Sequence, residues 1–221
     1  MKHTFYHIML IVLFALCYNS ITAQSYYPLK DGQTWKYNFI DYATSDTNRT
    51  NVDAMVSGKH NREVWSTTEV IFELRKDSVV NGKNYKVIVN KQNPFDVNLV
   101  REEGGNFFML NNSTFKEENF LKTDVNVDDV WLDYENAEQT VATLYMVVAK
   151  EQTIQIKGKT YNNVIGIGKV TASVERIVTI LQSDNPFIPV TYYAKGLGMI
   201  YSYLPYPLGG RYSDLEVSVR D

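Results

Sequence analysis

Apolar side chains recur at every second position through much of this chain, and that period of two favours β-sheet. Residues 35–39 alternate aromatic with polar side chains, and residues 215–219 alternate aliphatic with polar ones. Successive side chains of a strand point to opposite faces, so this spacing gives each strand one apolar and one polar face. The pattern therefore predicts half-buried strands over most of the chain.

Tight turns separate the predicted strands. Asn81-Gly82 follows Val79-Val80 and precedes an alternating run at 85–89, and Asn-Gly favours a type I′ turn, in which both central residues have positive φ. Lys157-Gly158 predicts a second turn. Further strands are predicted at 97–101, 106–110, 140–156, 164–182, 192–194, 199–204 and 215–219. Many short strands joined by turns predict a mainly β fold, an antiparallel sheet that forms a sandwich or a half-barrel.

Helix is expected to be scarce. The polar segment 46–62 is compatible with a loop or a short helix, and segments 114–122 and 134–142 are each candidates for a short helix. No Pro/Ser-rich linker and no break in composition interrupts residues 24–221. The sequence therefore predicts a single β-rich domain over that range, with few, short helices.

The first 23 residues have the features of an export signal. Lys2 and His3 give a basic start, and residues 5–16 are almost wholly apolar. Spanning a bilayer takes roughly 20 apolar residues, so this run is too short for a transmembrane helix. The small side chain of Ala23 suits cleavage before Gln24. We expect residues 1–23 to be a signal peptide and the mature protein to be periplasmic, on the cell surface or extracellular.

Cys17 offers a different link to the envelope. A cysteine just after the apolar core can be the lipid-modified residue of a lipoprotein, although Leu16 stands where such signals usually carry Gly, Ala or Ser. A membrane contact is therefore expected only through the signal peptide or through a lipid on Cys17. A buried core helix is the structural alternative for residues 5–23.

Composition excludes several chemistries from a mature chain that begins at Gln24. Cys17 is the only cysteine, so that chain has no disulfide, zinc–thiolate site or cysteine nucleophile. The formal net charge of -3 argues against a nucleic-acid partner, since such proteins usually carry a basic face. No cofactor is expected, because the Gly-x-Gly at Gly196 and Gly198 lacks the strand–turn–helix context of a nucleotide site.

Two groups of residues are weighed as catalytic candidates. His60 is the only histidine after residue 23, and its polar surroundings favour a solvated loop over a catalytic base. The densest acidic cluster is Asp124, Asp128, Asp129, Asp133 and Glu135. Paired carboxylates can hydrolyse glycosides, and oxygen ligands can hold calcium, but the spacing lacks the central Gly and distal Glu of a calcium loop. The expectation is a solvated acidic loop, with no catalytic or metal residue assigned.

The segment 199–210 is unusually aromatic. Exposed apolar patches mark interaction sites, so its tyrosines Tyr201, Tyr203 and Tyr206 are the candidate ligand-binding residues, forming an exposed lip for a glycan, a lipid or a protein. The alternative is a segment packed on the sheet, in which case its rings belong to the core.

Three segments resemble those of a group of exported bacterial proteins. They are residues 27–37 (YPLKDGQTWKY), residues 158–164 (GKTYNNV) and residues 192–200 (YYAKGLGMI). They look like the corresponding segments of secreted or lipid-anchored β-sheet proteins of Bacteroidetes type, akin to the TapB-like proteins. The resemblance implies one exported β-rich domain and no particular chemistry, because the group has no established one.

These expectations favour a non-enzymatic binding or interaction domain of the cell envelope, with an amphiphile, a glycan or a protein as its ligand. The alternative is a carboxylate-based glycan hydrolase. A continuous apolar cavity would favour a carrier of amphiphiles. A polar cleft with two facing acids from residues 124–135 would favour the hydrolase, and a flat aromatic face at 199–210 would favour an interaction module.

Overall fold

The computed structural model describes residues 24–44, 64–112, 114–183, 188–208 and 211–219, and after Tyr203 it describes the backbone alone. Within these ranges the chain forms twelve strands and one helix. The expected signal peptide at 1–23, with Cys17, lies outside them, and so do His60 and the segment 46–62.

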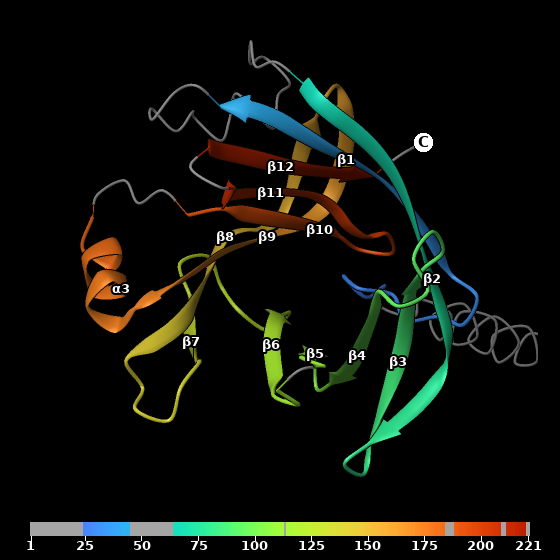
Figure 1. Ribbon diagram of the computed structural model, residues 1–221, viewed down its shortest axis with the longest axis horizontal. Coiled ribbons are helices and arrows are strands. Elements are labelled where there is room, and N and C mark those ends of the chain that lie inside the picture. Colours follow the sequence, from blue (N-terminus) through green and yellow to red (C-terminus); the bar gives the residue numbers. More distant parts are fainter. Residues whose placement is uncertain (1–23, 45–63, 113, 184–187, 209–210, 220–221) are drawn as a thin grey trace, which may run out of the picture.

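The twelve strands make one antiparallel sheet (Figure 1). Their bounds are β1 Thr34–Thr44, β2 Val64–Val80, β3 Lys83–Asn90, β4 Val97–Glu103, β5 Asn106–Leu110, β6 Glu117–Lys122, β7 Val130–Tyr134, β8 Val141–Ile156, β9 Lys159–Ser173, β10 Val190–Ala194, β11 Gly198–Leu208 and β12 Arg211–Val219. The predicted mainly β, antiparallel fold is confirmed, and of the two predicted forms the sheet takes the curled half-barrel.

The sheet is a meander with one long-range junction. Its order is β6-β5-β4-β3-β2-β1-β12-β11-β10-β9-β8-β7, so every pair of neighbours is consecutive in the chain except β1 and β12. That pair joins the two ends of the chain, with Tyr37 opposite Val219 and Thr44 opposite Tyr212. The end strands of the sheet are β6 and β7, which a short loop connects.

The predicted turns are confirmed. Asn81 and Gly82 have φ values of 50° and 76°, and Lys157 and Gly158 have φ values of 48° and 84°. Both turns therefore use the left-handed conformation that Asn and Gly tolerate best. They join β2 to β3 and β8 to β9.

The curl of the sheet has a local cause in β-bulges. The β8–β9 ladder changes register three times between Val147 and Ile154, and the β2–β3 ladder does so between Arg75 and Asp77. A bulge bends its strand and increases the local twist. The long hairpins therefore wrap around a concave face instead of lying flat.

The prediction of a short helix is wrong for segments 114–122 and 134–142. Residues 117–122 form strand β6, where a register shift between Phe107 and Phe108 leaves Phe120 without an opposite residue. This bulge buries the adjacent Phe120 and Leu121 together, which is why the segment lacks a period of two. Residues 134–142 form the end of β7, a turn and the start of β8; the side chain of Asn136 accepts hydrogen bonds from the backbone N–H groups of Thr140 and Val141 at 3.0 and 3.2 Å.

The one helix of the described residues, α3 (Val174–Leu181), occupies the end of a run predicted as strand. Ser173 ends β9 and caps the helix, because its hydroxyl accepts a hydrogen bond from the backbone N–H of Arg176 at 3.3 Å. Ile177 is buried against Ala142 and Leu144 of β8. The Val and Ile content of 164–182 favours a strand. In the last part of this segment the Ser173 cap and the packing of Val174, Ile177 and Ile180, which are spaced as on one face of a helix, override that local preference.

Side chains close the gap between the two end strands. The indole Nε1 of Trp131 in β7 donates to the backbone oxygen of Asn119 in β6 at 2.8 Å. Lys116 Nζ lies 2.7 Å from Asp133 Oδ1 and also donates to the backbone oxygen of Tyr134. We call this contact region the seam; it brings β6 and β7 together without a backbone ladder.

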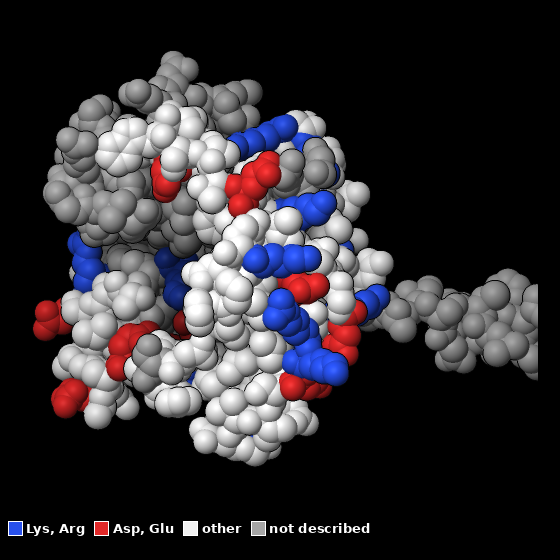
Figure 2. Space-filling model, turned by 45° about the vertical axis from the view of Figure 1, so that its right-hand side comes forward, with Lys and Arg blue, Asp and Glu red and all other residues white. Residues whose placement is uncertain are grey.

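Charged side chains of both signs are interleaved on the face of the molecule that Figure 2 shows. One cluster on the outer side of β3, β4 and β6 centres on Glu117, which binds Lys83, Tyr85 and Arg101. Such pairing keeps this outer surface free of a strong field of one sign.

Candidate functional site

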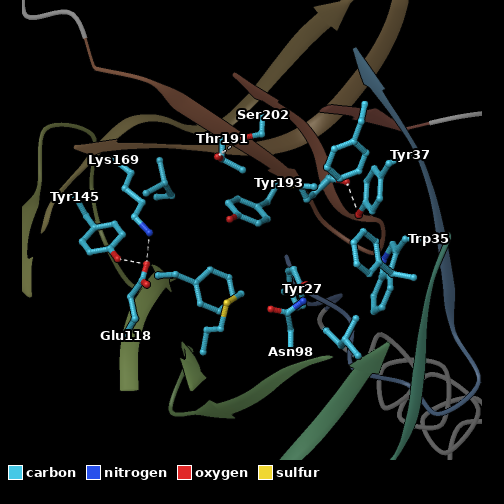
Figure 3. Close-up of a pocket in the computed structure, with 17 residues that line it drawn as sticks. Tyr27, Trp35, Tyr37, Asn98, Glu118, Tyr145, Lys169, Thr191, Tyr193 and Ser202 are labelled. Carbon is cyan, nitrogen blue, oxygen red and sulfur yellow. Dashed lines mark hydrogen bonds and ion pairs between the residues drawn. The ribbon is translucent and has the colours of Figure 1, made fainter. Parts of the chain in front are cut away.

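A cavity of about 310 Å³ lies within the curl of the sheet and is the candidate functional site (Figure 3). Strands β1 to β6 and β8 to β11 all contribute side chains to its lining. The mainly apolar lining residues are Tyr27, Trp35, Tyr37, Phe39, Phe72, Ile88, Met109, Phe120, Ile167, Tyr193 and Met199. The more polar ones are Asn98, Glu118, Tyr145, Lys169, Thr191 and Ser202.

Tyr27, which precedes the first strand, contributes a central aromatic ring. Its centroid lies 5.8 Å from that of Trp35, 5.5 Å from that of Phe120 and 6.1 Å from that of Tyr193. Aromatic pairs at these separations and tilted angles attract one another beyond their area of burial. The N-terminal segment therefore forms part of the cavity wall, in contact with strands that follow much later in the chain.

Hydrogen bonds fix the aromatic wall against the turn between β10 and β11. The indole Nε1 of Trp35 donates to the backbone oxygen of Leu197 at 2.9 Å, and the Tyr37 hydroxyl donates to the backbone oxygen of Met199 at 3.1 Å. Gly198 has a φ of +90°, and a Cβ there would lie 2.9 Å from Trp35 Nε1. A glycine is required at this position by both the backbone angle and the close approach of the indole.

The opposite end of the cavity is polar. Glu118 Oε1 accepts hydrogen bonds from the Tyr145 hydroxyl and from Lys169 Nζ, which lies 2.5 Å away. Burial, and then the charge of Glu118, raises the pKa of Tyr145 well above its usual range. The phenol therefore stays protonated and serves as a donor to the carboxylate. Figure 3 shows this group at one side of the cavity and Trp35 and Tyr37 at the other.

Three polar side chains in the cavity retain unused hydrogen-bonding capacity. The hydroxyls of Tyr27 and Tyr193 and the amide of Asn98 make no hydrogen bond to any residue that the structure describes. Burial raises the pKa of Tyr27 to about 12 and that of Tyr193 above its usual range, so both phenols are neutral near pH 7. By contrast, the hydroxyls of Thr191 and Ser202 bind each other at 2.7 Å.

The predicted aromatic lip at 199–210 is not an exposed surface where the structure describes its side chains. Tyr201 and Tyr203 are each 0 % exposed and pack with Tyr42, Ile156 and Ile200. Both tyrosines belong to this second cluster of buried residues, which agrees with the alternative in which the segment packs on the sheet. Neither tyrosine lines the cavity, whereas Ser202 between them does. The side chain of Tyr206 lies outside the described residues.

Three acids of the predicted acidic cluster each have a different partner. Asp129 accepts a hydrogen bond from the backbone N–H of Asn126 at 2.7 Å, and Asp133 pairs with Lys116. Glu135 accepts a hydrogen bond from the Thr143 hydroxyl at 2.5 Å. None of the five acids lines the cavity. In the described part of the chain, no three His, Cys, Asp or Glu side chains are grouped to hold a metal ion.

Among the residues that the structure describes, no helix is long and apolar enough to cross a membrane.

The polar end of the cavity was not predicted from the sequence, whereas part of its aromatic end lies in the segments that carry the resemblance. Segments 27–37 and 192–200, on which the resemblance rests, supply Tyr27, Trp35 and Tyr193. Trp35 is also a buried member of the main core cluster. The only signal for Glu118 and Lys169 was a charged residue on the inward face of a strand, which cannot be read until the bulges set that face.

No family model matches this chain, and no curated protein matches it significantly. Two solved structures are similar to it. One is a protein inferred to be exported, with a YmcC-like fold, from Bacteroides fragilis, with 10 % identity and a TM-score of 0.40 over 90 % of this chain and 100 % of that one. The other is a protein inferred to be a lipoprotein from Parabacteroides distasonis, with 12 % identity and a TM-score of 0.37 over 90 % of this chain and 99 % of that one. Neither description uses the TapB-like name, and at these TM-scores the similarity supports no inference about this chain.

Proposed function

We propose that this chain is an exported, non-enzymatic binding protein that holds one small amphiphile in the cavity of its curled sheet. The observation that carries the proposal is the cavity itself, with aromatic rings at one end and a hydrogen-bonded carboxylate at the other. Small-molecule sites are typically concave, mainly apolar and roughly 300–1,000 Å³ in volume, with a few placed polar groups. The volume of about 310 Å³ fits the lower end of that range.

The placement of the other candidate residues supports this proposal over its rivals. The hydrolase alternative needs two facing acids from 124–135 in a polar cleft, and none of these acids lines the cavity. The interaction module needs an exposed aromatic face at 199–210, and Tyr201 and Tyr203 are buried. Export, by the signal peptide at 1–23 or with a lipid on Cys17, is part of the proposal, and the sequence pattern of residues 1–23 supports it.

Binding of a neutral fluorescent probe tests the proposal. We expect N-phenyl-1-naphthylamine to bind the purified chain from Gln24 saturably, with one probe per chain, and to gain emission as it enters the aromatic cavity. Replacing Asn98→Phe places a ring in the cavity from β4 and should weaken probe binding about tenfold or more, since about 1.4 kcal/mol of lost contact is a factor of ten.

Leu99→Phe is the matched control, because the adjacent residue of the same strand points to the opposite face. We expect this variant to bind the probe as the parent does. Absence of saturable binding to the parent, or equal weakening by both substitutions, would overturn the proposed function.

A further inference from the structure

The cavity has a built-in polarity that restricts which amphiphile it can hold. Glu118 Oε1 is occupied by Tyr145 and Lys169, whereas Glu118 Oε2 makes no hydrogen bond to any residue that the structure describes. Glu118 lines the cavity, so this second oxygen is an acceptor available to a ligand. The Glu118 side chain is 32 % exposed, so a ligand hydroxyl that donates to Oε2 would take the place of water there.

The charges at this end already balance. The Glu118 carboxylate and the Lys169 ammonium form an ion pair, so the site offers no net charge to an ionic ligand. A ligand carboxylate would approach Glu118 against like-charge repulsion, and a ligand ammonium would approach Lys169 in the same way. Removing such a ligand charge from water adds a further cost. An uncharged head group avoids all three costs.

The hydroxyl of Tyr193 complements Glu118. Tyr193 lines the same cavity, makes no hydrogen bond to the described residues, and its ring contacts Phe120 and Tyr27. Figure 3 shows its hydroxyl directed toward the side of the cavity that holds Glu118 and Lys169. A ligand hydroxyl at this end has an acceptor in Glu118 and a donor in Tyr193, while its apolar body contacts the aromatic wall around Trp35.

From this arrangement we infer that the cavity selects uncharged amphiphiles whose hydroxyl group donates to Glu118, over carboxylates and amines with the same apolar body. The inference rests on the proposed function, since it names the ligand class of the same cavity. Glu118 is the residue that determines specificity, and Lys169 is a positioning residue that neutralises and orients its carboxylate.

Displacement of bound N-phenyl-1-naphthylamine by ten-carbon competitors tests the inference. At pH 7.5 we expect 1-decanol to displace the probe at a concentration at least about tenfold lower than decanoate, decylamine or 1-methoxydecane. The ether has an acceptor but no donor, so it isolates the hydrogen bond to Glu118. In Glu118→Gln the carboxylate charge is gone and Lys169 is released, so decanoate should gain and the alcohol-to-carboxylate ratio should fall several-fold.

Glu117→Gln is the matched control, because it makes the same substitution at the next residue, which faces the outer cluster. It should keep the preference for decanol. If the parent binds the probe but all four competitors displace it equally, or if Glu118→Gln leaves the ratio unchanged, the inference is wrong and the proposed function stands. Should Glu118→Gln not fold, the ratios measured with the parent still decide, whereas absence of probe binding would remove the proposed function itself.

Discussion

Glu117 and Glu118 are neighbours in the sequence with separate environments. In strand β6 their side chains alternate, so Glu118 faces the cavity and Glu117 faces the outer cluster. Glu117 accepts hydrogen bonds from Arg101 Nη2 at 3.0 Å and from the Tyr85 hydroxyl at 2.6 Å, and it also pairs with Arg101 Nε and Lys83. The hydrogen bonds from Arg101, followed by those from Lys83 and Tyr85, lower the pKa of Glu117 to about 2.

Replacing Glu117→Gln should lower the free energy of unfolding near pH 7 by about 2 kcal/mol, as for loss of hydrogen bonds to a charged group. Because the pKa in the folded protein lies below the ordinary value of 4.5, this stabilisation is full above about pH 4.5 and is lost as the pH falls toward 2. Urea unfolding of both proteins at pH 7 and pH 3 should show the difference between them shrink at the lower pH.

Glu103→Gln is the control for this cluster. Glu103 also binds Arg101, at 2.7 Å, but its side chain is 72 % exposed against 17 % for Glu117. Exposed ion pairs contribute little, so we expect a change within about 0.5 kcal/mol. Equal losses for the two substitutions would contradict the role assigned to burial.

At the scale of elements, the seam is where the sheet depends on side chains. Edge strands present unpaired backbone groups, and here the Trp131 indole occupies one of them, the oxygen of Asn119. The Trp131 ring also stacks on Tyr145, with centroids 5.0 Å apart and planes 7° apart. Since Tyr145 donates to Glu118, the seam is connected to the polar end of the cavity.

Trp131→Phe should retain the stacking on Tyr145 and lose the hydrogen bond to Asn119. We expect a loss of about 1 kcal/mol in unfolding free energy, and faster amide hydrogen exchange in β6 and β7 than in β3. Trp65→Phe serves as the control, since Trp65 is 51 % exposed on β2 and its replacement should change exchange little. Unchanged exchange in β6 and β7 would show that the seam does not depend on this indole.

The elements differ in how well the sequence predicted them. Hairpins at Asn81-Gly82 and Lys157-Gly158 were predictable because a positive φ requires particular residues, whatever the surroundings. Strand β6 was not predictable, because its bulge removes the period of two that indicates a strand. Helix α3 was not predictable either, because the Ser173 cap starts a helix in a segment whose Val and Ile content indicates a strand. The cavity was not predictable either, because aromatic side chains that line a cavity and those that fill a core have the same spacing.

At the scale of the whole molecule, the sheet is completed by strand β12. This last strand pairs with β1 on one side and with β11 on the other, so it joins the meander β1–β6 to the meander β7–β11. No local signal in the sequence predicts the pairing of β12 with β1, because these two strands lie far apart in the chain.

A chain that stops at Gly210 should therefore lose its single cooperative unfolding transition, because the β1 and β11 edges are left without a partner. A chain that stops at Val219 retains every paired residue of β12 and is the control. Urea unfolding followed by circular dichroism distinguishes them, and an unchanged transition in the shorter chain would show that β12 is dispensable.

The junction of β1 with β12 also bears on how the polypeptide is made. A nascent chain emerges from its N-terminus, so β1 and β2 are synthesised long before the strand that covers β1. Until residues 211–219 arrive, the open edge of β1 is available to any passing extended segment, including that of another newly made chain. During synthesis, strands β1 and β2 therefore remain with one open edge until β12 is made, and a chaperone that shields an exposed strand edge would act in that interval.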